Sequence, residues 1–506
     1  MHIDPDPTPR PLDHLALMGR RDAPALSQRG GVLNHGMLDQ MVGKVAGGLR
    51  ALGMARGDRV ASWLPKNLLA CLMPLAAARA GLVHVSINPM LKHGQVAHIL
   101  ADSGAQLLVT GRGRADTIEQ QDRPADCRLL IEEDEAGALF EAGAPLPPSS
   151  NDPSELVSIL YTSGSTGRPK GVMLSHANLW LGAVSVAAYL GLAADDRTLA
   201  VLPLSFDYGQ NQLLSTWYAG GCVYPLDYLT PRDVVRAVGR HGITTLAGVP
   251  PLWIQLAESD WPAESVASLR RLTNTGGRMS VPLVRRLRAL FPEARLFSMY
   301  GLTEAFRSTF LDPMLIDDHP DSIGKAIPFA EILVVRPDGS IAGADEPGEL
   351  VHAGPLVAQG YWRDAERTAL RFRPAPPASS YGGTAVWSGD TVVRDGEGLL
   401  RFVGRDDEMI KSSGNRISPT EIEEAAVASG AVAEAVALGI PDDRLGQSIL
   451  LYARPTGESA EARLAEWFRR NLPGFMQPAK VIWRDELPRN ANGKLDRAAL
   501  KREAEA

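Results

Sequence analysis

The stretch YTSGSTGRPKG, residues 161–171, has the composition of a phosphate-binding loop, with three glycines, two serines, two threonines, an arginine and a lysine. In the common NTPase loop, a lysine directly follows the second of two glycines spaced five apart. Here Pro169 separates Arg168 from Lys170, and Gly171 follows. The composition therefore indicates phosphate binding, while the order of the residues argues against an ordinary NTPase.

The flanking sequence predicts a strand before this stretch, at 156–161, and a helix that begins near Ser175. A strand, a glycine-rich loop and a helix can hold phosphate oxygens through backbone N–H groups and the helix dipole. Around them, helices are expected at 38–52, 68–80, near 212 and after 250, and strands at 58–64, 107–110, 198–202 and 244–248. Strands that alternate with helices predict an α/β fold with a mostly parallel sheet.

The pattern of predicted secondary structure changes twice after residue 320. Residues 321–400 contain short strands separated by turn residues, which indicates a β-rich subdomain. The charged segment around Asp407 is a linker or hinge, and the last ~100 residues have an α/β pattern of their own. We therefore expect a large N-terminal domain of mixed sheets flanked by helices, with the β-rich subdomain, over 1–406, and a small α/β C-terminal domain over 407–506.

Composition and charge exclude several classes of protein. A net charge of -7 argues against a nucleic-acid partner, which usually requires a basic face. The three cysteines are too few for a disulfide framework, and the acidic, proline-bearing N-terminus does not resemble a signal peptide. The apolar run 179–194 is shorter than the ~20 residues of a membrane span and predicts a buried helix. We expect a soluble, cytoplasmic protein.

Five separated stretches carry a resemblance to one family. They are YTSGSTGRPKG (161–171), MYGLTE (299–304), WSGD (387–390), GRDDEMIKSSGNRISPTEIEE (404–424) and PRNANGKLDR (488–497). Each alone could be only a turn or a cap. In this order they resemble the adenylate-forming superfamily of acyl-CoA synthetases, luciferases and the adenylation enzymes of peptide synthesis, over about 340 residues.

The resemblance implies a two-step ligase. ATP and a carboxylic acid form an acyl-adenylate with release of pyrophosphate, and the acyl group then passes to a thiol. Carboxylate and triphosphate are both anionic, so the first step needs charge neutralisation and alignment more than acid–base help. The implied cofactors are ATP and Mg2+, with CoA or the phosphopantetheine arm of a carrier protein as the acceptor.

The resemblance also assigns nucleotide-binding roles. The loop would shield the β- and γ-phosphates, and the residues in or beside it that we expect to bind are Ser163, Gly164, Ser165, Thr166, Gly167 and Lys170. Thr303 would contact the α-phosphate, and Glu304 would hold Mg2+. The nucleoside would lie among Tyr300 on one face of adenine, Gly276 and Gly277 on the other, and Asp390 and Arg405 at the ribose.

The last two motifs imply a mobile C-terminal domain. Lys494 would bridge the reacting carboxylate and the α-phosphate as charge develops. A rotation at the hinge Asp407 would then replace Lys494 with the face from Lys411 to Gly414 for thioester formation. Glu408 stands where many members of the family carry Asp, which is a mild departure.

The segment 202–214 is the most informative about the acid. Fatty- and aryl-acid members of the family usually carry His where Phe206 stands, and the pair Phe206–Asp207 resembles the amino-acid-activating branch, in which the Asp binds the substrate's ammonium group. An Asp in an apolar pocket costs free energy unless it is paired. Two alternatives remain: Arg307 pairs with Asp207 internally, or Asp207 faces solvent. Arg307 could also recognise a second acid group.

Tyr208, Asn211 and Met299 are further candidates for the acid pocket by position. We therefore expect activation of an amino acid or similar small acid, followed by loading of CoA or a free-standing carrier protein, because only twelve residues follow Lys494. The alternative is an AMP-forming acyl- or aryl-CoA synthetase. A luciferase-like oxygenase has no specific support, and a non-catalytic member is disfavoured because Lys494, Glu304 and Asp390 are all present.

Overall fold

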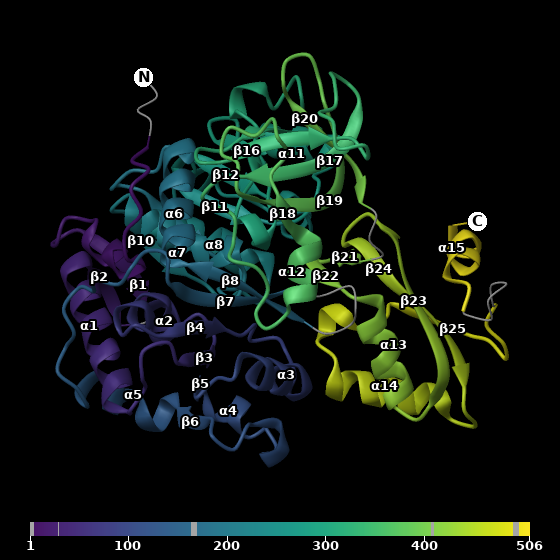
Figure 1. Cartoon of the computed structure of the whole chain (residues 1–506), viewed down its shortest axis with the longest axis horizontal. Helices are drawn as coiled ribbons and strands as arrows, with labels where there is room; N and C mark the ends of the chain where they lie inside the picture. The colour runs from purple at the N-terminus through teal and green to yellow at the C-terminus, as the bar shows by residue number, and fades with distance from the viewer. Residues whose placement is uncertain (1–4, 29, 163–168, 406–408, 489–494, 506) are drawn as a thin grey trace.

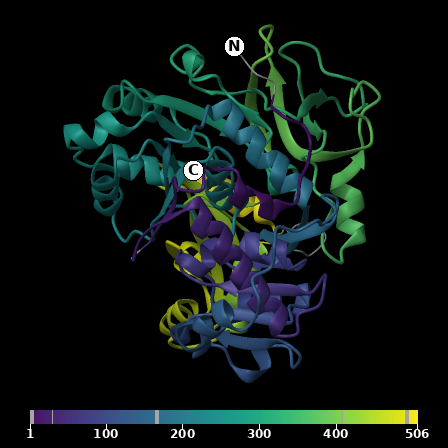
Figure 2. The ribbon, with the colours of Figure 1, turned by 90° about the vertical axis from the view of Figure 1, so that its left-hand side faces the viewer.

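The computed structural model describes residues 5–28, 30–162, 169–405, 409–488 and 495–505. They form an α/β structure of three sheets, of which two belong to a large N-terminal part and one to a smaller C-terminal part (Figure 1). In the side view, most of the purple and dark blue segments lie below the teal and green segments of the middle of the chain (Figure 2). The predicted fold class is confirmed.

The first sheet holds the strand that precedes the phosphate-loop motif. Its order is β6 (Arg128–Ile131), β5 (Leu107–Thr110), β3 (Arg59–Trp63), β4 (Val83–Ser86), β7 (Leu156–Thr162) and β8 (Lys170–Ser175). All neighbours are parallel except the hairpin β7–β8. The helices and 3-10 turns of this region are η1 (Leu12–Leu17), α1 (His35–Ala51), α2 (Leu68–Arg79), α3 (His93–Ser103), α4 (Arg112–Ala115), η2 (Gln120–Asp122) and α5 (Glu132–Glu141).

The β7–β8 hairpin corrects one expectation. Ser175 does cap the following helix, since its side chain accepts from the backbone N–H of Asn178. However, β8 stands between the loop and that helix and pairs with β7 so that Tyr161 lies opposite Gly171. Val172 and Leu174 alternate into the core on this strand, which explains its extended form. The motif therefore joins two antiparallel strands, and the helix N-terminus does not directly follow it.

The second sheet has 14 strands and continues through the predicted β-rich subdomain. Its order is β16 (Glu331–Val335), β17 (Pro347–Ala353), β19 (Thr384–Arg394), β20 (Leu400–Arg405), β15 (Ser322–Ala326), β14 (Thr309–Phe310), β13 (Arg295–Tyr300), β12 (Arg271–Asn274), β11 (Thr245–Gly248), β9 (Arg197–Ala200), β10 (Cys222–Pro225), β1 (Pro24–Gln28) and β2 (Gly31–Asn34), with β18 (Phe372–Pro374) on β19. Strands β10, β9, β11, β12 and β13 are parallel, whereas the pairs from β13–β14 to β17–β19 are antiparallel. The β-rich segment is thus the antiparallel end of this sheet.

Helices of the second sheet include α6 (His176–Leu190) and α7 (Asp207–Tyr218), which pack against each other. Helix α6 contains residues 179–190 of the apolar run 179–194 and is buried on nearly all sides, as predicted for the run. The remaining helices and turns are α8 (Pro231–His241), α9 (Pro250–Ala257), α10 (Ala263–Ser268), α11 (Val281–Leu290), η3 (Thr303–Ala305), η4 (Pro313–Leu315) and α12 (Ala365–Arg371). Within the described ranges, no helix has the length and apolarity that a membrane span requires.

The C-terminal part has its own sheet and core. Its strands are β22 (Asn415–Ile417), β21 (Ile410–Ser412), β24 (Gly446–Pro455) and β23 (Val432–Asp442), with β25 (Lys480–Trp483) on β24. Its helices and turn are α13 (Pro419–Ala428), α14 (Ala460–Asn471), η5 (Gly474–Met476) and α15 (Arg497–Glu505). Its apolar side chains form a cluster separate from the N-terminal cores. Asp407, the expected hinge, lies outside the described residues.

The C-terminal part docks on the N-terminal part through its β21–β22 turn. A Cβ built on Gly414 would lie 3.0 Å from Cγ2 of Val249, directly before α9. Arg444 pairs with Glu258 at 2.8 Å, and Gln95 of α3 donates to the carbonyl of Asn471 at 3.3 Å. The β21–β22 hairpin therefore lies against Val249, directly after β11 of the large sheet.

Candidate active site

Three of the predicted nucleotide residues lie at the carboxyl edge of the parallel strands β12 and β13. In open α/β sheets, ligands bind at this edge. Asn274 of β12 is in register with Ser298 of β13. Gly276 and Gly277, which follow β12, and Tyr300, which ends β13, are therefore brought to neighbouring positions.

Gly276 and Gly277 leave a space free of side chains beside Val249 and Pro250. Gly276 has φ +80°, and a Cβ there would lie 3.3 Å from Cγ1 of Val249. A Cβ on Gly277 would lie 3.1 Å from Cγ of Pro250. Larger residues would fill this space, and the left-handed backbone at Gly276 favours glycine.

Tyr300 and Asp390 meet across the second sheet. The Tyr300 hydroxyl donates to Oδ2 of Asp390, which is buried on β19. Arg405 is the register partner of Asp390 on β20. Tyr300 and Asp390 thus meet although they are 90 residues apart in the chain, and the backbone of Arg405 lies beside Asp390.

Lys170 and Glu304 form a buried ion pair with Tyr361. Lys170 Nζ lies 3.0 Å from Oε1 of Glu304 and donates to the Tyr361 hydroxyl at 2.6 Å. That hydroxyl in turn donates to the same Oε1 at 2.6 Å. Sequence reasoning missed Tyr361, because it lies outside the five motifs. Only the fold brings it to Lys170 and Glu304.

Burial and charge act in opposite directions on this cluster. Burial alone would raise the pKa of Glu304, but Lys170 and the Tyr361 hydroxyl outweigh it and hold that pKa below its ordinary value. Burial lowers the pKa of Lys170, and Glu304 opposes the change. Glu304 is therefore a carboxylate at neutral pH, as a metal ligand must be.

The surroundings of Glu304 fit the predicted role in Mg2+ binding. Mg2+ is commonly held by one or two carboxylates together with substrate phosphates and water. Both hydrogen bonds of the Glu304 side chain within the described part of the chain fall on Oε1, which leaves Oε2 to act as a ligand. Among the described residues, no group of three or more His, Cys, Asp or Glu is arranged so that it could hold a metal ion.

A strained backbone separates Glu304 from Arg307. Phe306 has φ 61° and ψ -81°, an unfavourable conformation for a bulky residue. Its ring packs against α6, where a Cβ on Gly182 would come within 2.5 Å of it. Such strain costs about 1–3 kcal/mol and is found where a functional segment is held in place. The turn follows Thr303, which is half-buried at the start of η3.

Arg307 pairs with Asp207. Arg307 Nη1 donates to Oδ2 of Asp207 at 3.2 Å, and the two side chains are 3% and 13% exposed. The Arg307 guanidinium also lies over the ring of Tyr208, 4.6 Å from its centroid. Burial raises the pKa of Asp207, and Arg307 opposes this effect. Of the alternatives for Asp207, the structure has the internal pair.

A narrow cavity, whose volume of about 20 Å³ is room for one water molecule, lies beside this pair. Four of the six residues expected in the acid pocket line it, namely Tyr208, Asn211, Met299 and Arg307. Phe206 and Asp207 do not line it. The lining also includes Gln212, Ser215 and Thr216 of α7, which sequence reasoning missed. Their spacing of four, seven and eight residues from Tyr208 places them on one helix face and could have identified them.

The expected thiol face lies at the docked hairpin. Gly414 has φ +77° and forms the turn against Val249, and Lys411 Nζ lies 5.0 Å from the ring centroid of Phe402. The remaining predicted residues, Ser163, Gly164, Ser165, Thr166, Gly167, Asp407 and Lys494, lie outside the described residues.

The sequence matches two family models. Residues 14–362 match the AMP-binding enzyme family, and residues 421–494 match the AMP-binding enzyme C-terminal domain. A feruloyl-CoA synthase from Amycolatopsis sp is 33% identical over 490 residues, which cover 95% of this chain and 96% of that protein. An L-proline–[L-prolyl-carrier protein] ligase from Pseudomonas fluorescens is 30% identical over 486 residues, or 94% of each chain.

A solved relative allows the arrangement of the two parts to be compared. A double mutant of o-succinylbenzoate CoA synthetase from Bacillus subtilis, bound with its product analogue OSB-NCoA, superposes with a TM-score of 0.86 over 98% of each chain at 26% identity. The same enzyme in complex with the acyl-adenylate OSB-AMP gives 0.71 at the same coverage and identity. This chain therefore superposes better on the structure with the product analogue than on the one with the acyl-adenylate.

Proposed function

The chain belongs to the AMP-binding enzyme family and is an AMP-forming, adenylate-forming acid–thiol ligase, and from this premise we propose that it is an acyl- or aryl-CoA synthetase. ATP and a carboxylic acid give an acyl-adenylate and pyrophosphate, and CoA then takes the acyl group as a thioester. ATP and CoA are the co-substrates of this class, and Mg2+ accompanies the nucleotide.

The observation that carries the choice of acid is the Asp207–Arg307 pair. An amino-acid substrate would need a carboxylate whose counter-ion is the substrate's ammonium group. Asp207 already has a buried guanidinium 3.2 Å away, so an ammonium would add a second cation to one carboxylate. The pair therefore favours acids that lack the amine, in line with the CoA synthetases among the relatives.

The nucleotide-binding roles that we propose are supported by the positions of these residues in the structure. Tyr300, Gly276 and Gly277 would hold adenine, and Asp390 the ribose, beside the Lys170–Glu304 pair. ATP would draw Lys170 toward its terminal phosphates and leave Glu304 to Mg2+. Mg2+ supplies charge neutralisation on the phosphates in this chemistry.

We also propose that the docked hairpin represents the thioester-forming arrangement. It places Lys411 and Gly414 beside Val249, at the edge of the large sheet that holds the nucleotide residues. Adenylation would then need a rotation near Asp407 that brings Lys494 to the α-phosphate. The two TM-scores, 0.86 with the product analogue and 0.71 with the acyl-adenylate, support this interpretation.

The test is substrate-dependent ATP–pyrophosphate exchange, followed by chromatographic detection of the CoA thioester. Aromatic, fatty and amino acids would be compared, each amino acid beside its deaminated analogue. We expect exchange with acids that lack an amine, and CoA thioester formation from the same acids. Exchange restricted to an amino acid would instead establish amino-acid activation, which the carrier-protein ligase among the relatives favours as the second candidate.

A further inference from the structure

The walls of the acid cavity carry polar groups of two kinds. The first kind is already satisfied within the protein: Tyr208 donates to the carbonyl of Thr273 at 2.7 Å, and the hydroxyls of Thr216 and Thr198 bond to each other at 2.8 Å. Ser215 donates to the backbone carbonyl of Asn211 at 2.7 Å. These groups therefore do not need a hydrogen bond from a ligand.

The second kind has no partner among the described residues. Both amide atoms of Gln212, Nδ2 of Asn211 and Nε of Arg307 are buried without a hydrogen bond. Gln212 is 5% exposed and Asn211 2%, and all three residues line the cavity. A buried polar group without a partner typically costs about 1–3 kcal/mol, so these groups are expected to meet hydrogen-bonding atoms of the ligand.

The strand register shows where these groups lie along the cavity. Thr198 and Thr245 are in register with Arg295 of β13, through Arg271 of β12. Met299 lies four residues further along β13 toward the carboxyl edge, a distance of about 13 Å at roughly 3.3 Å per residue. Helix α7 descends this length from Tyr208, beside Arg307, to Thr216, beside Thr198. Gln212 is therefore midway between the mouth and the floor.

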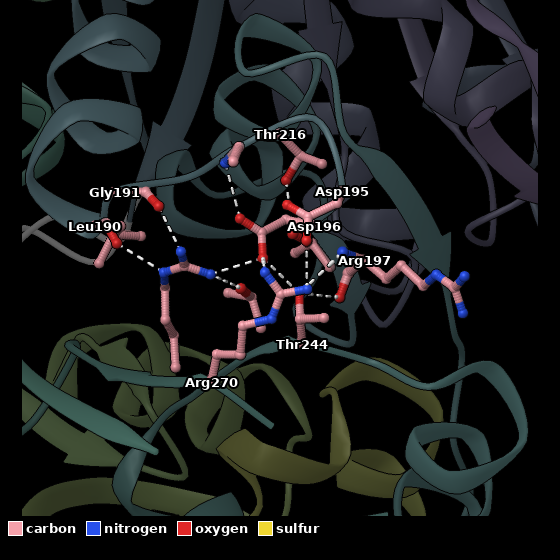
Figure 3. A network of polar contacts seen from close by, with 12 residues as sticks. Leu190, Gly191, Asp195, Asp196, Arg197, Thr216, Thr244 and Arg270 are labelled. Carbon is pink, nitrogen blue, oxygen red and sulfur yellow. Dashed lines mark hydrogen bonds and ion pairs between the residues drawn. The ribbon is translucent and has the colours of Figure 1, made fainter. Parts of the chain in front are cut away.

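The fixed charges around the cavity are balanced. Asp207 neutralises Arg307 at the mouth. At the floor, Arg271 pairs with Asp196 at 2.7 Å and donates to the carbonyl groups of Leu190 and Gly191. Figure 3 shows Leu190, Gly191 and Asp196 within this closed network. A second carboxylate or an ammonium on the ligand would find no unpaired charge, so an uncharged tail is favoured.

We propose that the substrate is a monocarboxylic acid with an otherwise apolar body that bears an uncharged hydroxyl, and that Gln212 is the residue that recognises this hydroxyl. A hydroxyl both accepts and donates, so it satisfies Nε2 and Oε1 of one amide together. Val186, Tyr189, Leu192 and Met299 supply the apolar wall for the rest of the acid. This inference rests on the proposed function and specifies its substrate class.

Matched acids with and without the hydroxyl test the inference, with kcat/KM for acid-dependent pyrophosphate exchange as the readout. Suitable pairs are 4-hydroxycinnamic and cinnamic acid, 4-hydroxybenzoic and benzoic acid, and a hydroxyalkanoic acid with its parent alkanoic acid. The native enzyme is expected to favour the hydroxylated member of at least one pair by 10-fold or more. Gln212→Leu should remove about 10- to 100-fold of kcat/KM for that member and leave the parent acid nearly unchanged.

Gln210 provides the matched control. It is 1% exposed on the same helix, both of its amide atoms also lack a partner among the described residues, and it does not line the cavity. Gln210→Leu should keep the native ratio between the two acids. Thermal unfolding checks that the variants are folded, and Gln212→Met replaces Gln212→Leu if the latter is not.

Three results would overturn the inference: no discrimination in any pair, equal losses for both acids in Gln212→Leu, or the same change of ratio in Gln210→Leu. These differ from a failure of the proposed function, in which exchange occurs with no acid or only with amino acids. Discrimination that is lost only in the Gln212 variants supports the assignment.

Discussion

Arg307 and Asp207 are 100 residues apart in the sequence, yet they form a buried ion pair at 3.2 Å beside the acid cavity. The pair decides what the cavity offers to a substrate, because each partner cancels the other's charge. The pair also links the segment after Glu304 to the start of α7, and thereby connects the predicted nucleotide residues with the acid pocket.

Asp207→Ala should destabilise the protein and impair all acids alike. The substitution leaves Arg307 buried without its counter-ion, which costs about 3–5 kcal/mol. Thermal unfolding and kcat/KM for an amino acid and its deaminated analogue provide the measurement. Asp207→Ala combined with Arg307→Met removes both charges and should recover much of the lost stability. Loss confined to the amino acid would instead assign Asp207 to the ammonium group.

Tyr361→Phe should weaken ATP-dependent adenylation. The phenol holds Oε1 of Glu304 and accepts from Lys170, and bonds to charged groups contribute about 1.5–3 kcal/mol. We expect kcat/KM for ATP to fall roughly 10- to 100-fold and the Mg2+ requirement to rise, measured by pyrophosphate exchange across Mg2+ concentrations. Tyr381→Phe is the control, since Tyr381 is 51% exposed, and it should behave as the native enzyme. An unchanged Mg2+ dependence in Tyr361→Phe would contradict this role.

Lys494→Ala should separate the two half-reactions. The lysine is proposed to act only where charge develops at the α-phosphate, and loss of such a group costs roughly 10²-fold or more. Pyrophosphate exchange should fall by that factor, while CoA thioester formation from a preformed acyl-adenylate should be spared. Equal loss of both steps would argue against a rotating C-terminal domain.

Gly414→Ala should have the opposite effect. A Cβ at this position would lie 3.0 Å from Cγ2 of Val249, on a backbone with φ +77° that only glycine adopts readily. The hairpin would then dock poorly, so thioester formation from the acyl-adenylate should fall by about 10-fold or more with little change in exchange. Gly430→Ala is a matched control, because Gly430 also has a positive φ but has no atom within 4 Å of a built Cβ. If the two alanine variants lost thioester formation equally, backbone strain rather than docking would be the cause.

The docking of the C-terminal part should weaken as the pH rises from the ordinary pKa of a glutamate toward about 7. Burial raises the pKa of Glu421 to about 7, with Glu424 adding to the shift and the Gln95 side chain of α3 opposing it. A carboxyl group whose pKa is raised by docking favours the docked state most strongly at low pH, and this contribution is lost between its ordinary pKa and 7. Fluorescence energy transfer between labels on α3 and α14 would measure it, and Glu421→Gln should flatten the pH profile. A profile unchanged by that substitution would exclude Glu421 as the cause.

Local sequence was sufficient for most secondary-structure elements. The helix predicted at 68–80 is α2 (Leu68–Arg79), and the strand at 107–110 is β5, because periodicity and helix caps act over a few residues. The helix predicted to begin near Ser175 is α6, but the sequence reading did not include strand β8, which lies between the phosphate-loop motif and this helix. The alternation in β8 covers only Val172 and Leu174, so this short strand became evident only through its pairing with β7.

The motifs alone identified an acid–thiol ligase and predicted a phosphate loop and a carboxylate for the metal, since such residues occur in short fixed orders. The tertiary structure determined which side chains interact with one another. Tyr361 reaches Lys170 across 191 residues, Arg307 reaches Asp207 across 100, and the unpaired amide of Gln212 faces a cavity rather than the core. The physical reason is that parallel strands with crossover helices bring distant segments to one sheet edge, where burial makes each pairing or its absence energetically decisive.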